Sequence, residues 1–386
     1  MWIKREIESY LHNMQDKFPV ILVTGPRQAG KTSLLRHLYP KMQYITFDDP
    51  NKVMQAENSP NQFLQDLDYP VILDEVQYVK DLFRFIKITV DSMPYKTHFY
   101  LTGSQQFSMM QNVSESLSGR ILILNLNTLT YQEVSKPVSK TNLTDFLLKG
   151  GYPSLYSHRL DPLEWFPSYI SSYLERDVRN ILRIADLRDF SSFIKLLATR
   201  SGQLLNLSSL ARDVAKAPNT IKSWISVLVN SGTIRLLEPY YHNLGKRMIK
   251  SPKIYFMDTG LLSYLLGIHS PVALESSPFR GAIWETYCFV TLYTKFCNQG
   301  ITNPPVWFWR DPSNREVDFI IEQDNQFHLI ESKWKERAQI QDAENLLYWK
   351  EHFSFSENSS VKMQIMAPVK EPYPISPEII VSSLLD

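Results

Sequence analysis

A glycine-rich loop near the amino terminus constrains the fold of this chain more than any other stretch. An apolar, β-prone run at residues 20–23 leads into the loop, a helical pattern follows it at residues 33–38, and its four fixed positions are Gly25, Gly30, Lys31 and Thr32. The glycines allow backbone conformations in which successive N–H groups turn inward and, with the helix N-terminus, hold phosphate oxygens. Strand, loop and helix together predict a phosphate-binding loop in an α/β fold.

The polar residues of this loop have expected roles. Lys31 would reach the β- and γ-phosphates of a nucleotide, and the hydroxyl of Thr32 would ligate Mg²⁺. The alternative is an ordinary glycine turn followed by a chance lysine, but the fit of all four positions and both flanks argues against it. We therefore expect ATP and Mg²⁺ as cofactors. The residues expected to bind ATP are Gly25, Pro26, Arg27, Gln28, Ala29, Gly30, Lys31, Thr32 and Ser33.

A second apolar run, at residues 71–73, ends in two adjacent carboxylates, Asp74 and Glu75. A short continuous apolar run is typical of a parallel strand buried on both faces, and α/β sheets bind ligands at the carboxyl ends of their strands. Asp74 would hold the Mg²⁺ shell, and Glu75 would polarise the attacking water as general base. Such a pair alone often marks only a helix start, but together with the loop it predicts ATP hydrolysis.

Two further positions supply candidate catalytic residues. The strand expected before Thr102 ends in small hydroxyl side chains, and we expect either Thr102 or Ser104 to contact the γ-phosphate or the attacking water, with Ser104 favoured. Arg120 precedes an apolar strand at residues 121–124, where its planar guanidinium would suit a phosphate held by a neighbouring subunit. The alternative interpretation of Arg120 is a simple cap at a helix C-terminus.

In their order, these motifs resemble those of AAA+ ATPases, and more closely those of prokaryotic AAA+ proteins that join such a core to a C-terminal domain of unknown function. The resemblance implies a P-loop NTPase parallel sheet sandwiched by helices, ATPase activity, and a homo-oligomer in which Arg120 acts in trans. It implies no particular biological substrate. The motifs that carry the resemblance lie at residues 25–32, 73–77, 101–104, 118–120, 150–153 and 173–178.

Length and composition bound the remaining possibilities. A chain of 386 residues is too long for one ordinary core. Only two cysteines, a charged N-terminus and no apolar run of membrane-spanning length predict a cytoplasmic protein with no membrane partner. The expected domains are an AAA+ core at 1–140, a helical linker or lid at 141–185, a winged helix-turn-helix at 186–268 and a restriction-endonuclease-like α/β domain at 269–386.

The region from residue 190 to residue 256 shows helices, a tight turn, a further helix and two strands around a basic loop, which is typical of a winged helix-turn-helix. Residues 186–253 contain 11 Lys or Arg against 4 Asp or Glu, although the whole chain has a net charge of only +1. Because a basic patch attracts nucleic-acid phosphates, we favour DNA as the partner. Winged helices also serve as protein-binding modules, so a protein partner stays open. The residues expected to bind DNA are Lys222, Lys246, Arg247 and Lys250.

Three strands are expected near residues 307–310, 316–321 and 327–333. A two-residue turn at 324–325 places Asp318 opposite Glu331, on one face with Lys333. Two carboxylates can hold Mg²⁺ for phosphodiester cleavage, and a lysine can stabilise the transition state. The set resembles the PD-(D/E)xK nuclease core, whose first helix usually carries another acid; Glu285 fits that position. The proline that commonly precedes the aspartate is absent, since Val317 stands there.

Two hypotheses for function follow from these patterns. In the first, ATP moves the winged helix and a C-terminal nuclease cuts DNA, with Mg²⁺ at Glu285, Asp318 and Glu331 and with Lys333 as the catalytic lysine. In the second, a regulatory ATPase binds DNA or a protein partner without cleavage. A protein-remodelling machine is the weaker third hypothesis, since no substrate-engaging pore motif stands out.

Overall fold

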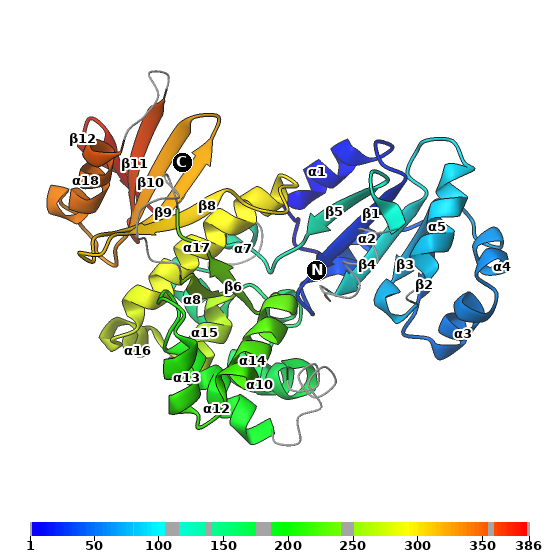
Figure 1. Ribbon diagram of the computed structural model, residues 1–386, viewed down its shortest axis with the longest axis horizontal. Helices are drawn as coiled ribbons and strands as arrows, with labels where there is room; N and C mark the ends of the chain where they lie inside the picture. The colour runs from blue at the N-terminus through cyan, green and yellow to red at the C-terminus, as the bar shows by residue number, and fades with distance from the viewer. Residues whose placement is uncertain are drawn as a thin grey trace.

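The computed structural model describes residues 2–79, 81–104, 116–135, 141–174, 187–240, 251–353 and 359–383. Figure 1 shows one sheet at each end of the molecule, with a helical part between and below them. Three of the residues expected to bind DNA, Lys246, Arg247 and Lys250, lie outside the described residues. The side chain of Ser104 and residues 175–178 of the last motif also lie outside them.

The N-terminal part is a parallel sheet in the order β2-β3-β4-β1-β5, which confirms the predicted parallel α/β fold. Every residue of β1 is buried, because a continuous apolar run in a central strand is covered on both faces. Strand β4 separates β1, which leads into the glycine-rich loop, from β3, which ends in Asp74. The strands are β1 (Val20–Gly25), β2 (Gln43–Thr46), β3 (Val71–Asp74), β4 (Phe99–Ser104) and β5 (Ile121–Asn125).

Each face of this sheet has its own helices, because alternate residues of a strand point to opposite sides. Ile21 and Val23 pack with α1 and α2, whereas Val20 and Leu22 pack with α3, α4 and α5. The sheet is therefore sandwiched by helices, as predicted. The helices are α1 (Ile7–Met14), α2 (Lys31–Leu38), α3 (Pro50–Asn58), α4 (Pro60–Gln65) and α5 (Leu82–Asp91).

The middle of the chain is mainly helical, and its described residues include one antiparallel hairpin, β6–β7. Side-chain caps fix two helix starts here: Asn206 accepts the Ser209 N–H before α13, and Asp258 accepts the Leu261 N–H before α15. The elements are α7 (Tyr131–Ser135), α8 (Leu143–Lys149), α9 (Pro153–Ser157), α10 (Pro162–Tyr169), a π-helix (Ile170–Leu174), α12 (Leu187–Ala198), α13 (Leu207–Asp213), α14 (Pro218–Asn230), β6 (Ile234–Leu237), β7 (Lys253–Phe256), α15 (Thr259–Leu265) and α16 (Pro271–Ser276).

The C-terminal part is a mixed sheet in the order β12-β13-β11-β10-β9-β8. Asp324 and Asn325 have positive φ angles of 50° and 62°, which a two-residue hairpin turn requires. Gln323 therefore pairs with Gln326, which confirms the predicted register. The elements are α17 (Arg280–Asn298), β8 (Val306–Arg310), β9 (Glu316–Gln323), β10 (Gln326–Ser332), α18 (Glu344–His352), β11 (Ser360–Met366), β12 (Tyr373–Ser376) and β13 (Ile379–Ser382).

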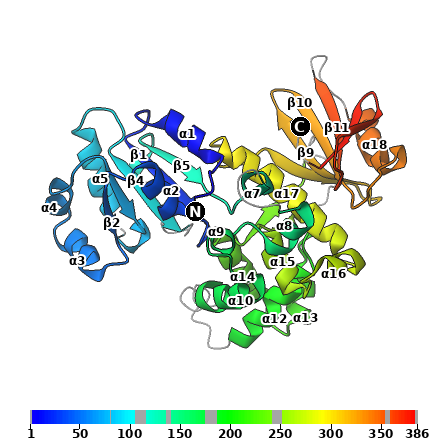
Figure 2. The same ribbon diagram turned by 180° about the vertical axis from the view of Figure 1, so that it is seen from behind.

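Helix α17 joins the two sheets. Figures 1 and 2 show it running from the C-terminal sheet to α1 and β5, and it contacts all three. At its N-terminal-sheet end, the Asn298 amide donates to Glu6 Oε2 at 3.0 Å. One buried apolar cluster contains Leu129, Trp224 and Phe319, from the three parts of the chain. Within the described part of the chain, none of the helices has both the length and the apolarity needed to cross a membrane.

Candidate functional site

The glycine-rich loop joins β1 to α2 in a backbone conformation that depends on its glycines. Gly25 has φ +144°, and a Cβ there would lie 2.1 Å from the Leu126 carbonyl oxygen, so no other residue fits. Gly30 has φ +93° and is the N-cap of α2. Between the two glycines, Gln28 also takes a positive φ of 64°. The loop N–H groups and the N-terminus of α2 therefore surround one small volume, which suits phosphate oxygens.

Lys31 is buried beneath this loop. Its ammonium donates to the carbonyl oxygens of Gly25 and Pro26 at 3.1 and 3.0 Å. Burial lowers the pKa of Lys31 to about 8, and the nearby carboxylates of Glu75 and Asp74 oppose that shift. An ammonium held in so poorly hydrated a position interacts strongly with a phosphate placed on the loop.

Asp74 gathers polar side chains from neighbouring elements. Its Oδ1 accepts hydrogen bonds from Thr32 Oγ1 at 2.7 Å and from Thr102 Oγ1, and its Oδ2 accepts one from Tyr44 at 2.7 Å. These residues meet because the carboxyl ends of parallel strands share one edge of the sheet. One carboxylate beside a threonine hydroxyl is an oxygen donor set that fits Mg²⁺ bound to a nucleotide.

Glu75 follows Asp74 in a strained backbone conformation. Its φ is +57°, which is uncommon for a residue with a Cβ, and its N–H donates to Thr102 Oγ1 at 3.2 Å. Thr102 thus contacts both acidic residues, although we favoured Ser104 from the sequence. The Ser104 backbone pairs with Gly25 at the end of β4, and a catalytic role for its side chain stays a prediction.

A pocket of about 480 Å³ opens over the loop, a volume within the range of small-ligand sites. One wall comes from α9 and the residue after it, which our sequence analysis did not assign to the nucleotide site. The pocket is lined by Arg27, Gln28, Gly30, Lys31, Thr32, Ser33, Asp48, Glu75, Tyr78, Pro153, Ser154, Ser157 and His158.

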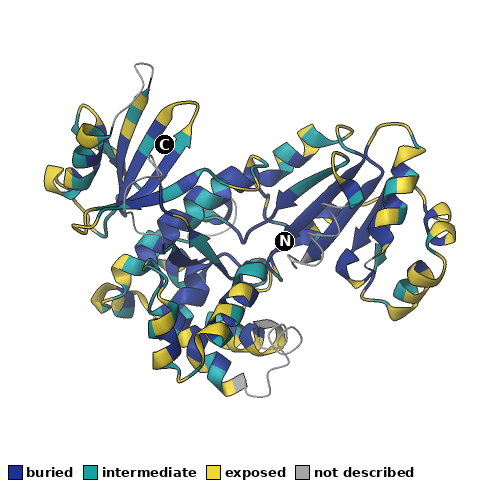
Figure 3. Ribbon diagram, viewed as in Figure 1, coloured by how far each residue is buried: buried dark blue, intermediate teal, exposed yellow. Residues whose placement is uncertain are grey.

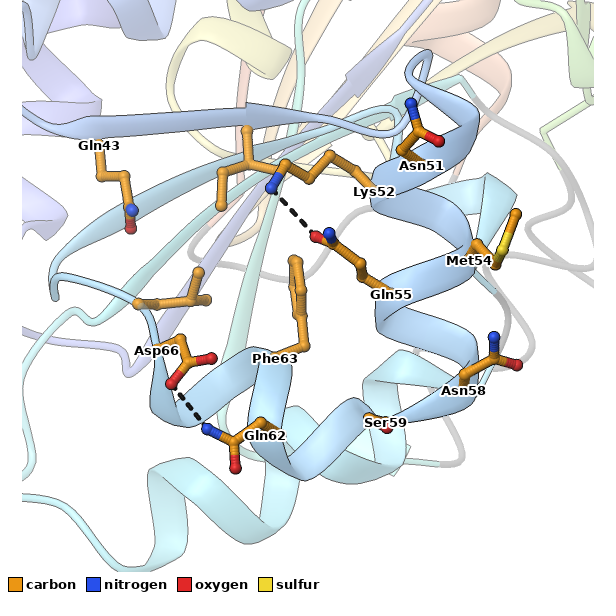
Figure 4. A pocket seen from close by; sticks show the side chains of 12 residues that line it. Gln43, Asn51, Lys52, Met54, Gln55, Asn58, Ser59, Gln62, Phe63 and Asp66 are labelled. Carbon is orange, nitrogen blue, oxygen red and sulfur yellow. Dashed lines mark hydrogen bonds between the residues drawn. The ribbon is translucent and has the colours of Figure 1, made fainter.

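Another hollow, of about 540 Å³, lies among β2, α3 and α4 (Figure 4). Its lining includes no residue of the glycine-rich loop. Polar side chains there are satisfied by one another, as Lys52 donates to Gln55 and Gln62 donates to Asp66. The smaller pocket over the loop is therefore the candidate nucleotide site.

Arg5 is a buried residue of this site that our sequence reasoning missed. Its Nη1 donates to the Ala29 carbonyl oxygen at 3.0 Å, its Nη2 donates to the Asn127 carbonyl oxygen at 2.7 Å, and its Nε pairs with Glu133 Oε1 at 3.2 Å. The side chains of Arg5 and Glu133 are only 4% and 1% exposed. Arg5 therefore fixes the glycine-rich loop to the segment after β5, because a guanidinium can donate in several directions.

Arg120 lies away from the loop of its own chain. It precedes β5, whose first residue Ile121 pairs with Val20 at the start of β1, so Arg120 is at the opposite edge of the sheet from Gly25. Its guanidinium pairs with Asp91 of α5 through Nε at 2.5 Å and Nη2 at 3.0 Å. From this position Arg120 cannot reach a phosphate on the glycine-rich loop of its own subunit. Contact with a phosphate held by a neighbouring subunit stays a prediction.

A carboxylate cluster lies at the start of β9 in the C-terminal part. Glu285 of α17 and Glu316 and Asp318 of β9 each offer an oxygen within 4.8 Å of the others. Lys253 of β7 inserts its ammonium here, 2.9 Å from Glu285 Oε1 and 2.5 Å from Glu316 Oε1. Burial raises the pKa of Glu285 to about 7 although Lys253 opposes that shift. From the sequence we expected Glu285 and Asp318 here, and missed both Glu316 and Lys253.

The other residues of the predicted nuclease set lie beside this cluster. Lys333 donates to Glu331 Oε1 at 2.6 Å, and burial beside Asp318 raises the pKa of Glu331 well above its usual value. Asp318 Oδ2 accepts hydrogen bonds from the N–H of Ser332 at 2.8 Å and from its hydroxyl at 2.7 Å. The structure therefore brings Glu285, Asp318, Glu331 and Lys333 into one region, with Lys253 among the carboxylates.

Family models match most of the chain in three stretches. An AAA domain matches residues 17–135, and two domains of unknown function (DUF8612 and DUF4143) match residues 140–272 and 280–383. The uncharacterized proteins Rv2008c of Mycobacterium tuberculosis and Mb2031c of Mycobacterium bovis are each 33% identical over 322 residues, or 83% of this chain and 71% of theirs. The Walker-type ATPase PABY2304 of Pyrococcus abyssi is 19% identical, with 68% of this chain and 96% of that chain covered and a TM-score of 0.44.

The role assigned to Arg5 predicts a binding defect. The Arg5→Lys substitution keeps the positive charge, but an ammonium has fewer N–H donors than a guanidinium. At least one charge-assisted hydrogen bond to the loop is therefore lost, worth about 1.5–3 kcal/mol. We expect the KM for ATP to rise about tenfold with kcat changed much less. Steady-state ATP hydrolysis measures both constants.

The matched control for this experiment is Arg84→Lys, because Arg84 is exposed on α5 and far from the loop. Melting temperatures of both variants separate a binding defect from loss of fold. An unchanged KM in folded Arg5→Lys would contradict the positioning role.

Proposed function

This chain belongs to the family of AAA-domain proteins that includes the uncharacterized protein Rv2008c of Mycobacterium tuberculosis, and we propose that it is an ATP-driven switch acting on nucleic acid. The AAA domain, with its glycine-rich loop and its Asp74 and Glu75 carboxylates, makes the chain an ATPase. The observation that carries the proposal is the close approach of the glycine-rich loop to two segments in the middle of the chain, at Pro153 and at Gly232.

Two close approaches form this contact. A Cβ on Gly232, between α14 and β6, would lie 3.3 Å from Pro26 Cδ, and a Cβ on Gly30 would lie 3.7 Å from Pro153 Cγ in α9. Pro26 and Gly30 belong to the segment that surrounds phosphate. Since packed side chains transmit displacement, a change of the loop with nucleotide state would move both α9 and the start of β6.

We assign helices α12–α14 and hairpin β6–β7 to a winged helix-turn-helix with α14 as its recognition helix. Trp224 and Leu228 of α14 are buried, whereas Lys222 and Ser226 are exposed on its other side. Figure 3 shows exposed residues along the outer faces of these helices. Arg212 of α13 is also exposed and lines a cleft at the turn before α14. Arg212 and Lys222 are therefore suited to bind phosphates.

This function predicts a uniform loss of DNA affinity in Arg212→Ala and Lys222→Ala. Each substitution removes one phosphate contact, so the slope of log affinity against log salt should fall by about 1 for every duplex sequence. Fluorescence anisotropy with two unrelated duplexes over a salt series measures this effect. Lys96→Ala, at an exposed position in the AAA domain, is the control. Wild-type affinity and slope in both variants would refute the assignment and leave a protein partner as the alternative.

A second candidate function is Mg²⁺-dependent cleavage by the C-terminal part. Two features support a PD-(D/E)xK-like arrangement: the element order α17-β8-β9-β10-α18-β11, and the β9–β10 pairing, whose last pair, Phe319 with Ile330, lies next to Asp318 and Glu331. Oxygen ligands from Glu285, Asp318 and Glu331 would suit Mg²⁺, and Lys333 would stabilise charge on the phosphate. Lys253 among these carboxylates favours the switch without cleavage for the conformation observed.

The nuclease candidate predicts Mg²⁺-dependent nicking of supercoiled plasmid by the wild type in the presence of ATP. Asp318→Asn should abolish nicking, since it removes a metal ligand while keeping the size of the side chain. Lys362→Met, at an exposed position on β11, should nick as the wild type does. Equal nicking by wild type and Asp318→Asn would exclude this site as its source.

A further inference from the structure

The side chain of Lys253 is almost completely buried. Lysine side chains are rarely buried in this way unless opposite charges lie beside them. The Lys253 side chain is 2% exposed, and its ammonium lies 2.9 Å from Glu285, 2.5 Å from Glu316 and 3.8 Å from Asp318. The three carboxylates come from two elements, α17 and β9, and the lysine comes from a third, β7. A buried cation from the hairpin therefore lies inside a cluster of acids built by the C-terminal part.

The spacing of the carboxylates suits a divalent cation as well as an ammonium. The three oxygens lie within 4.8 Å of one another. Ligand oxygens on opposite sides of Mg²⁺ are about 4.2 Å apart, and those around Ca²⁺ up to about 5 Å. The ammonium of Lys253 thus occupies the position that a metal ion would take.

A second observation concerns Glu331, the acid that lies beside the cluster next to Asp318. Glu331 Oε2 is buried and has no hydrogen-bond partner among the residues that the structure describes, while its Oε1 binds Lys333. Two neighbouring donors already bind these acids: Arg310 pairs with Glu316 at 3.3 Å, and Tyr255 donates to Glu285 at 2.5 Å. A buried carboxylate oxygen without a partner calls for a cation or a proton.

A few contacts link the strand that carries Lys253 to the segments around the nucleotide pocket. Strand β7 pairs with β6, whose approach segment at Gly232 packs on Pro26. Five residues after Lys253, Asp258 accepts the N–H of Gly151 at 2.8 Å, just before α9 enters the wall of the nucleotide pocket. Strand β7 therefore begins in the carboxylate cluster, and two residues after its end Asp258 binds the segment that leads into the wall of the nucleotide pocket.

We propose that the carboxylate cluster is a divalent-cation site that Lys253 closes, so that metal binds only when the β6–β7 hairpin withdraws the lysine. The inference rests on the second candidate function, because a metal-dependent phosphodiester site needs this cation. Lysine and metal exclude each other, since both occupy the centre of the same three oxygens. We expect the bound nucleotide to control the position of the β6–β7 hairpin.

Titration with Mn²⁺, followed by the electron paramagnetic resonance signal of the free ion, tests the proposal. All proteins carry Asp74→Asn and contain no nucleotide, which removes the metal site of the ATPase. Lys253→Met should gain one Mn²⁺ site per chain, with affinity at least about tenfold above its parent, and adding Asp318→Asn should remove that site. Lys253→Arg, which keeps a cation in place, and Lys362→Met should bind as the parent does.

The parent itself offers a measurement that needs no change at Lys253. With the lysine in place, adding Asp318→Asn alone should leave Mn²⁺ binding unchanged. An Asp318-dependent site in the parent, or no gain in a folded Lys253→Met protein, would overturn the proposal. Metal binding by Lys253→Met without plasmid nicking would support closure by the lysine and remove the nuclease candidate, so the two failures are distinguishable.

Discussion

One buried carboxylate, Asp258, joins the segment that leads into α9 to the start of α15, and the arrangement of the middle of the chain depends on it. It accepts the N–H of Gly151 at 2.8 Å and the N–H of Leu261 at 2.9 Å, and burial raises its pKa while these hydrogen bonds oppose that shift. The backbone around it is so close that only glycine fits. A Cβ on Gly150 would lie 2.1 Å from Asp258 Oδ1, and one on Gly151 would lie 2.1 Å from the Leu129 carbonyl oxygen.

In the proposed switch, the contacts of Asp258 would transmit movement from the nucleotide pocket to the rest of the chain. Leu129 belongs to the segment that follows β5, Gly151 leads into α9 at the nucleotide pocket, and Asp258 follows β7. A rigid contact of this kind passes on small displacements, because close-packed interiors have few voids to absorb them. In the proposed switch, hydrolysis with Glu75 as general base would therefore have a short path to the hairpin and, through Lys253, to the carboxylate cluster.

Local features of this fold were predictable from the sequence, and contacts between distant residues were not. The glycine-rich loop, the strand that ends in Asp74 and the β9–β10 register each depend on neighbours in sequence, so periodicity and turn chemistry predict them. Arg5 and Glu133 are 128 residues apart, and Lys253 and Glu285 are 32 apart. Neither pair has a spacing that a helix or strand imposes, so only the folded chain reveals them.

The choice between Thr102 and Ser104 illustrates the same limit within a single strand. Two residues apart, they share one face of β4 by alternation, so the sequence alone could not tell which one meets Asp74. The position of each residue along β4 determines which one contacts Asp74. Thr102 lies beside the end of the shorter β3, whereas Ser104 lies beside Gly25. The α9 wall was missed since nothing local ties residues 153–158 to the loop.

Coupling between the nucleotide pocket and the hairpin is the central claim, and hydrogen exchange tests it most directly. Peptides covering residues 25–33, 150–158 and 231–237 would be compared with and without Mg²⁺ and a non-hydrolysable ATP analogue, with Lys31→Ala as the binding-deficient control. The account predicts that nucleotide changes exchange in all three segments, and in none of them in the control. Protection confined to residues 25–33 would contradict it.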